Sequence, residues 1–423
     1  MRPVQGNFPE QDSALAVVQI DHTRANIEVV DDDERLPLGR PWITLAIDVF
    51  TRIVVGIYVT MDAPSAVSVG MCICNAILPK RAYLVELGVA GEWPVSGLPG
   101  TIHSDNGKDF RSNAVKRACD EYKVTHDFRP VATPHWGGHI ERLMKTTNSE
   151  IHNLPGTTFS NPKDRDSYDS SKHAAMTVRE FEAYLVDWIV NKYNLGFHRG
   201  IDAAPLAKFK RSILGSPDKP GIGLGPIPEE AKLRMDFLPF TRKVVRREGV
   251  VVHHVWYWDE VLKPRLEQNE RDDLKQKPKD LFRFDPRDMS VIYFWDPETS
   301  TYYPIPYKDA GKPPMSRYEL DRAKKQAKED GVAHIDEQVL FETANRLRQR
   351  ARDAVKTTKT VRKQKRQIAQ TEKLAGERRK AMAEAPAPSR DPERATTLII
   401  DDPFDGPVKA FRVTSVGTQP SGE

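Results

Sequence analysis

The order in which strand-like and helix-like patterns follow one another constrains the fold of this chain most strongly. Short apolar or alternating runs, typical of antiparallel strands, occur at residues 14–20, 25–30, 42–49 and 53–59. They are followed by a helix pattern at 66–78, a strand at 101–103, a helix at 112–123, a strand at 125–130 and a helix at 139–152. This order predicts an α/β core in which helices flank a mixed sheet.

The pattern changes beyond the core. Residues 153–175 are rich in Asn, Pro, Asp, Ser and Gly and indicate a connection, and a helix is expected at 177–193. Short strand patterns then predict a small all-β barrel, with runs at 242–247, 250–258, 281–284, 290–295 and 301–305. Within it, Trp256 and Trp258 are expected in the barrel core, which leaves Tyr257 on the opposite face, where it could meet DNA.

The C-terminal part carries most of the positive charge. Residues 346–380 contain fourteen Lys or Arg and three acidic residues, which indicates a solvated basic helix or a disordered arm. Such an arm can neutralise DNA phosphates without reading sequence, and Arg362, Lys363, Lys365 and Arg366 are candidates for this contact. We predict an N-terminal extension at 1–13, a core at 14–215, a barrel at 228–307, a basic helical arm at 315–384 and a flexible tail at 385–423.

The cysteine content and hydropathy exclude several protein classes. Three cysteines, Cys72, Cys74 and Cys119, cannot form a disulfide framework, and their spacing matches no zinc motif. We expect them in the core. The His135 to His139 segment has no accompanying Cys, so a glycine-rich mobile loop explains it better than a zinc site. The sequence shows no run of eighteen apolar residues and no signal-peptide pattern, which predicts a soluble intracellular protein.

Three carboxylates carry the chemistry of the predicted core. Asp21 follows the first strand pattern, Asp105 follows the strand at 101–103, and Glu141 lies at the start of a helix. Because strand ends in an α/β sheet can bring polar side chains together, these carboxylates are expected to converge. Clustered carboxylates repel one another unless divalent cations neutralise them, and hard oxygen ligands favour Mg²⁺. Two such ions suit an in-line phosphoryl displacement.

A structural reading competes with this one for any single aspartate. An Asp at a strand end is usually a turn or cap residue, and Asp48, Asp62 and Asp109 are read in this way. The combination of Asp21, Asp105 and Glu141 is harder to explain by turns alone, because the elements between them alternate as a catalytic core would require.

These motifs resemble those of a known family. The chain resembles the RNase H-like integrase core of DDE recombinases and, within them, the Mu/TniA/TnsB-type transposases, TniA in particular. Thirty-five residues separate Asp105 from Glu141, and the resemblance is carried by Ile20-Asp21-His22-Thr23, His103-Ser104-Asp105-Asn106-Gly107, Gly138-His139-Ile140-Glu141-Arg142-Leu143 and Leu154-Pro155-Gly156-Thr157-Thr158-Phe159-Ser160. It implies that Asp21, Asp105 and Glu141 are both the catalytic residues and the ligands of two Mg²⁺ ions, for which Mn²⁺ can substitute.

The residues beside the triad are candidates for DNA contacts. They are Asn106, Lys108, His139, Arg142 and Lys145. Lys145 lies one helical turn beyond Glu141 on the same face. The alternative is a solvated helix face and, for Asn106 and Gly107, a simple type I′ turn.

The resemblance implies an enzyme that cleaves transposon 3′ ends and joins them to target DNA. Its implied partners are the two DNAs, an AAA+ ATPase that we expect at residues 398–404, and further copies of the chain in a DNA-dependent oligomer in the bacterial cytoplasm. Two alternatives remain, a nuclease that only hydrolyses DNA and a catalytically silent DNA-binding or assembly protein. Related transposases carry helix-turn-helix domains ahead of the core, so we expect end recognition to come from a preceding segment or from another polypeptide.

Overall fold

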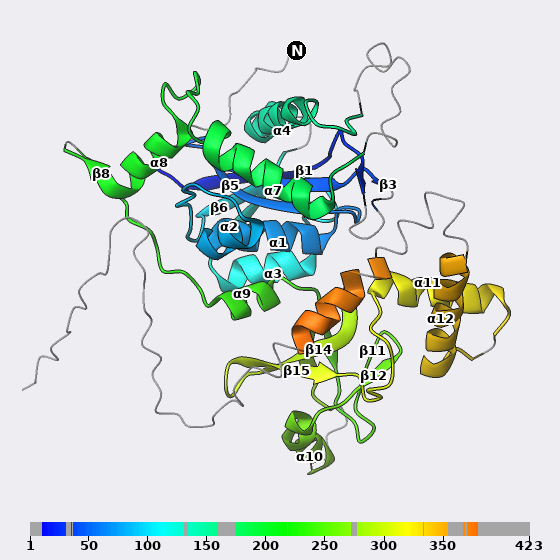
Figure 1. Cartoon of the computed structure of the whole chain (residues 1–423). Helices are drawn as coiled ribbons and strands as arrows, with labels where there is room; N and C mark the ends of the chain where they lie inside the picture. Colours follow the sequence, from blue (N-terminus) through cyan, green and yellow to red (C-terminus); the bar gives the residue numbers. More distant parts are fainter. Residues whose placement is uncertain are drawn as a thin grey trace, which may run out of the picture.

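The computed structural model of the chain (Figure 1) describes residues 11–30, 35, 37–130, 134–158, 174–217, 219–271, 277–332, 334–353, 367–368 and 370–379. Its centre is a five-stranded sheet in the order β5 (Val54–Thr60), β4 (Trp42–Asp48), β1 (Val17–Arg24), β6 (Thr101–Ser104) and β7 (Thr125–Phe128). The first three strands of this order are antiparallel, and β6 and β7 run parallel to β1. This mixed topology confirms the predicted RNase H-like core.

Helices cover both faces of the sheet. In Figure 1, α1 (Ala66–Ile77) and α3 (Asn113–Glu121) lie on one face, whereas α4 (Gly138–Ile151) and α7 (Val178–Trp188) lie on the other. Helix α1 comes close to the sheet because Gly56 of β5 has no side chain: a Cβ there would lie 2.7 Å from the carbonyl oxygen of Cys72. The three cysteines are buried and free, as predicted.

The short strand β2 (Val29–Val30) lies within the strand predicted at 25–30, and the π-helix η2 (Ile189–Tyr193) lies within the helix predicted at 177–193. Several other short elements were not predicted from the sequence. They are β3 (Pro37–Gly39), α2 (Arg81–Leu87), η1 (Pro134–Gly137), α8 (Pro205–Leu214), β8 (Gly215–Ser216), β9 (Lys219–Pro220) and α9 (Glu230–Asp236). Most span too few residues for a periodic pattern to become visible. One of them replaces a predicted loop, since the turn η1 leads directly into α4.

The second lobe is built from strands, as the sequence indicated. Strands β10 (Phe240–Lys243), β13 (Asp280–Asp285), β14 (Asp288–Asp296) and β15 (Thr301–Pro306) form an antiparallel sheet in this order. The hairpin of β11 (Val250–Val252) and β12 (Val255–Tyr257) joins the end of β15 through a bridge between Tyr257 and Tyr307. Helix η3 (Glu260–Leu262) and α10 (Lys263–Arg271) follow the hairpin.

The bridge to β15 corrects the orientation predicted for Tyr257. Tyr257 is fully buried and its hydroxyl donates a hydrogen bond to the carbonyl oxygen of Met289 (2.7 Å), so it cannot meet DNA. Trp256 and Trp258 are instead half-buried. Alternation was predicted correctly, but the inward face was assigned to the wrong residues because the strand partner was unknown.

The described C-terminal helices pack one face against the second lobe. Helix α11 (Arg317–Glu329) buries Leu320 there, and α12 (Glu337–Asp353) buries Leu340 and Phe341. In the helix at 370–379, the Thr371 hydroxyl donates to the carbonyl oxygen of Arg287 (2.9 Å) and Arg378 pairs with Asp285 (3.0 Å). The predicted solvated arm is therefore wrong for Arg348 and Arg378, which have acidic partners elsewhere in the fold, whereas Lys373 is largely exposed.

A buried polar network joins the two lobes. Asp236, at the end of α9, accepts hydrogen bonds from the hydroxyls of Tyr122 (2.7 Å) in the core and Tyr302 (2.6 Å) in the second lobe. Arg283 of β13 lies 3.5 Å from the Asp236 carboxylate and donates to the carbonyl oxygens of Asp236 and Leu238. Both charged residues are at most 3% exposed, so the junction is specified by complementary polar groups.

No helix among the described residues is long and apolar enough to cross a membrane.

Candidate active site

Asp21 and Asp105 are brought together by the parallel pairing of β1 and β6. The last pair of these two strands is Gln19 with His103, and continuing this register by two residues places Asp105 beside Asp21. The sequence suggested that Asp21 follows the end of the strand. Asp21 instead lies within β1, because β1 continues to pair with β4 up to Arg24. Strand β6 ends at Ser104, so the carboxylate of Asp21 borders an edge that β6 no longer covers.

Each aspartate is oriented by backbone hydrogen bonds. The Asp21 carboxylate accepts from the N–H of His22 (2.7 Å), and the Asp105 carboxylate accepts from the N–H of Gly107 (2.8 Å). The second bond forms an Asx turn. Because φ of Gly107 is not positive, the alternative considered for Asn106 and Gly107, a type I′ turn, is not formed. A Cβ at Gly107 would lie 2.9 Å from the Asp105 carboxylate oxygen, so the glycine makes room for this turn.

Gln19 fixes the helix that carries Glu141. Its side chain is fully buried, and its Nε2 donates to the carbonyl oxygen of Trp136 (2.7 Å) while its Oε1 accepts from the N–H of Ile140 (3.3 Å). These two bonds tie the beginning of α4 to β1 two residues before Asp21. Gln19 was not singled out from the sequence, although a Gln inside an otherwise apolar strand signals a buried hydrogen-bonding role.

A guanidinium lies between two of the three carboxylates. Arg129, one residue after β7, donates to Glu141 Oε1 (3.1 Å) and places its Nη2 3.8 Å from Asp21 Oδ2. Its side chain is 14% exposed. Gly137 leaves the space for it, because a Cβ there would lie 2.2 Å from the Arg129 guanidinium carbon. Sequence reasoning missed Arg129, which carries no motif and reaches Glu141 only through the fold.

The site is electrostatically costly without further positive charge. Burial raises the pKa of Asp21 to about 6, and the nearby Asp105 and Glu141 contribute in the same direction. The hydrogen bond from His22 and the charge of Arg129 oppose this shift. Three carboxylates and one guanidinium leave a net negative charge, so the cluster favours a cation.

The donor set fits a hard divalent cation. Carboxylate oxygens are the ligands that Mg²⁺ prefers, and the raised pKa of Asp21 shows that its ionised form lacks sufficient compensation. As placed, no three His, Cys, Asp or Glu side chains of the described residues form a group that could hold a metal ion. Arg129 lies between Asp21 and Glu141, where it keeps these two carboxylates from binding the same cation.

The predicted DNA contacts near the carboxylates fall into two groups. Lys108, Arg142 and Lys145 are exposed and available to a ligand. Asn106 instead has a structural role, because its Nδ2 donates to the carbonyl oxygen of Arg129 (2.6 Å) and its Oδ1 accepts from Arg111 (2.6 Å). Arg362, Lys363, Lys365 and Arg366 lie outside the described residues.

His139 belongs to a group of basic side chains that the sequence did not reveal. Burial lowers its pKa to about 4, and Arg52, Arg142 and His198 add to the shift. Burial also lowers the pKa of Lys208, with a further contribution from Arg52. These residues come from the β4–β5 turn, α4, the segment after η2, and α8. Their mutual repulsion indicates a positive surface beside the helix that carries Glu141.

The aspartates that were read as turn residues are structural where the structure tests them. Asp48 is fully buried and accepts from the N–H of Leu15 (3.0 Å) and the N–H of Thr51 (2.8 Å). Asp62 accepts from Gln367 (2.8 Å). Neither contributes to the carboxylate cluster, which separates them from Asp21, Asp105 and Glu141.

Comparisons with known proteins match this region. Residues 19–156, which include Asp21, Asp105 and Glu141, match the family described as the TnsB C-terminal domain. The chain is 27% identical over 228 residues to the transposase for transposon Tn552 of Staphylococcus aureus, covering 52% of this chain and 44% of the relative. It is 28% identical over 182 residues to the Tn7 transposition protein TnsB of Escherichia coli, covering 42% and 26%. The resemblance to Mu/TnsB-type transposases is thus confirmed, over less than half the length of each relative.

Solved structures with low overall similarity are integrases. The catalytic core domain of BIV integrase covers 47% of this chain and 95% of its own, with 16% identity and a TM-score of 0.28. A simian T-cell lymphotropic virus intasome in complex with the PP2A regulatory subunit B56 gamma covers 72% of this chain and 81% of the matched one, with 14% identity and a TM-score of 0.33.

Proposed function

We propose that this chain is the catalytic part of a DNA transposase that cleaves transposon 3′ ends and transfers them to target DNA. The observation that carries the proposal is that Asp105 and Glu141 lie close enough to Asp21 for their charges to raise its pKa, within the segment that matches the TnsB family. The transposases among its relatives support this reaction more than a general nuclease activity.

In this proposal the three carboxylates hold two Mg²⁺ ions, and Mn²⁺ can replace them. The ions would polarise the attacking and the leaving oxygen of the DNA phosphate. Asp21 and Asp105 supply rigid ligands, since both are held by backbone N–H groups, whereas Glu141 reaches in from α4. Lys108, Arg142 and Lys145 are exposed near these carboxylates and would position the DNA backbone.

A strand-transfer assay tests the proposal. The chain is incubated with Mg²⁺, a supercoiled plasmid and labelled duplexes whose 3′ ends are already exposed and carry the terminal sequences of its own element. Covalent joining of the label to the plasmid is the expected result. Release of short fragments without joining would support the hydrolytic nuclease instead, and the absence of both products would favour a silent DNA-binding protein.

Arg129 is expected to compete with the metal ions for the carboxylates. Replacing it with Gln should tighten Mn²⁺ binding about tenfold, since a charge-assisted hydrogen bond contributes roughly 1.5–3 kcal/mol and no longer has to be broken. Isothermal titration calorimetry measures this affinity without any DNA. The matched control is Arg111→Gln, which removes the same charge from a side chain that contacts Asn106 and no carboxylate of the triad. Equal Mn²⁺ affinity in the Arg129 variant and the wild type would exclude the competition.

The partners of the chain are part of the same proposal. We expect DNA-dependent oligomers, because two transposon ends require two active sites, and an AAA+ ATPase that contacts the segment 398–404. This segment lies outside the described residues. Deleting residues 386–423 should abolish co-purification of the ATPase while DNA strand transfer from precut ends continues. Retention of the ATPase by the shortened chain would refute this contact.

A further inference from the structure

The hairpin between β11 and β12 has an unusual turn. Its two central residues, His253 and His254, both have positive φ angles, 52° and 69°. Two-residue hairpin turns of this kind favour Asn-Gly, because most side chains are strained there. Strain of this kind persists where the surrounding structure imposes it and is often found at functional sites. The His-His pair therefore calls for an explanation beyond chain reversal.

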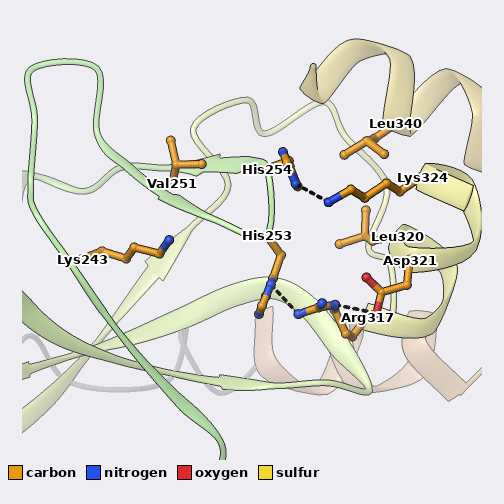
Figure 2. A pocket seen from close by; sticks show the side chains of 9 residues that line it. All are labelled: Lys243, Val251, His253, His254, Arg317, Leu320, Asp321, Lys324 and Leu340. Atoms are coloured by element: carbon orange, nitrogen blue, oxygen red, sulfur yellow. Dashed lines mark hydrogen bonds and ion pairs between the residues drawn. The ribbon is translucent and has the colours of Figure 1, made fainter. Parts of the chain in front are cut away.

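Both imidazoles border a cavity between the hairpin and α11, shown in Figure 2. The cavity has a volume of about 250 Å³. This is less than the roughly 300–1,000 Å³ of pockets that enclose a drug-sized ligand, so it suits a small group. Its walls are formed by Lys243, Val251, His253, His254, Arg317, Leu320, Asp321, Lys324 and Leu340.

The cavity is lined by more positive than negative side chains. Lys243, Arg317 and Lys324 are opposed by Asp321 alone, which pairs with Arg317 (2.8 Å). In Figure 2 the amines of Lys243 and Lys324 point towards the histidine turn from opposite sides. Within the part of the chain that the structure describes, no ion pair or side-chain hydrogen bond involves Lys243. An anion in the cavity would be attracted by positive side chains on both walls.

The histidines hold two of these cations in place. Lys324 Nζ lies 2.8 Å from His254 Nε2, and Arg317 forms a hydrogen bond with His253 Nδ1. Both contacts require the imidazoles to be neutral acceptors. Burial, together with the cationic neighbours, lowers the pKa of His253 to about 4, so it stays neutral at physiological pH. The same two causes lower the pKa of His254.

We propose that this cavity binds a backbone phosphate of DNA, with Lys243, Arg317 and Lys324 as the charged donors and the His253-His254 turn as the element that orients them. A phosphate has several acceptor oxygens and can accept from cations on two sides. The choice of DNA as the source of the phosphate rests on the proposed function. The site itself contains none of the catalytic carboxylates.

Salt-dependent DNA binding tests the charged donors. Fluorescence anisotropy is measured with a labelled duplex of random sequence, in the Asp21→Asn background and without divalent metal, so that no DNA is cut. Because each phosphate contact adds about 0.9 to the slope of log affinity against log salt, Lys243→Gln with Lys324→Gln should reduce the slope by about 1 and weaken binding roughly fivefold to tenfold at 0.1 M salt. Lys325→Gln with Lys328→Gln is the matched control, since it also removes two charges and both α11 side chains are exposed and lie outside the cavity.

A second variant separates the site from the stability of the hairpin. His253→Asn with His254→Gly suits the turn better, so the melting temperature should rise while DNA binding weakens by a similar factor. A higher melting temperature with unchanged DNA affinity would overturn the proposal. Inorganic phosphate distinguishes the two possible ligands. The cavity would be assigned to free phosphate and not to DNA if millimolar phosphate raised the melting temperature of the wild type but not of the two double variants, and if both double variants bound DNA as tightly as the wild type. If the wild type failed to transfer strands but the variants still showed these effects on DNA binding, only the proposed catalytic function would be rejected.

Discussion

Replacing Asp21 with Asn, Asp105 with Asn or Glu141 with Gln is expected to abolish both end cleavage and strand transfer, by about a thousandfold or more for each variant. The reason is that each residue supplies carboxylate oxygens to a shared pair of cations, and a neutral amide is a poor ligand for Mg²⁺. The measurement is the yield of joined product from precut ends, followed over time at saturating Mg²⁺. Loss should be equal for hydrolysis and joining, because both would use one set of ligands.

The same variants should keep their fold and their affinity for DNA. Asp21 is half-buried beside Asp105 and Glu141, so a neutral side chain there removes repulsion and should raise the melting temperature of the metal-free protein. Asp109→Asn serves as the matched control, because it removes a negative charge that interacts with Asp105 and leaves the three proposed ligands in place. An Asp21, Asp105 or Glu141 variant that still joined DNA at the rate of the wild type would remove that residue from the active site.

The core, and the approach of Asp105 to Asp21, could be predicted because they depend on local patterns. The strand runs that precede Asp21 and Asp105 are visible in the sequence, and the parallel register of their strands then aligns the two side chains. Glu141 follows from its place at the start of a helix. Arg129 could not be predicted in this way, because its contact with Glu141 depends on how α4 lies across β1, and that depends on the hydrogen bonds of Gln19.

For the second lobe, the sequence indicated the strands but not which of their side chains face inward. The inward face of β12 depends on the bridge between Tyr257 and Tyr307, whose residues are far apart in the sequence. Charge counting failed for the C-terminal helices for a related reason. A run of basic residues is solvated only if it lacks partners, and Arg348 and Arg378 find theirs in Glu319 and Asp285. Long-range pairing decided both cases.

Removing the carboxylate of Asp236 should destabilise the protein by about 3–5 kcal/mol, the usual consequence of leaving a buried charge without its partner. In Asp236→Ala the guanidinium of Arg283, which is 2% exposed, loses its anionic partner. The hydroxyls of Tyr122 and Tyr302 lose an acceptor at the same time. Urea denaturation followed by intrinsic fluorescence measures the free energy of unfolding.

The matched control for this variant is Glu121→Ala. Lys232 contacts both Asp236 (2.7 Å) and Glu121 (3.3 Å). The Glu121 side chain is 54% exposed, so its loss should change stability by less than about 1 kcal/mol. If Asp236→Ala were no more destabilising than this control, the network would be peripheral to stability.

The number of unfolding transitions carries the second half of this prediction. Asp236 belongs to α9 and contacts Tyr122 of the core on one side and Tyr302 and Arg283 of the second lobe on the other, so it couples the two lobes directly. Cooperative unfolding in one transition requires such coupling to exceed the difference in stability between the lobes. We therefore expect a single urea transition for the wild type and two for Asp236→Ala, with the near-ultraviolet signal of the second lobe lost first. A second substitution, Arg283→Met, should restore part of the lost stability, because it replaces the stranded buried charge with an apolar side chain.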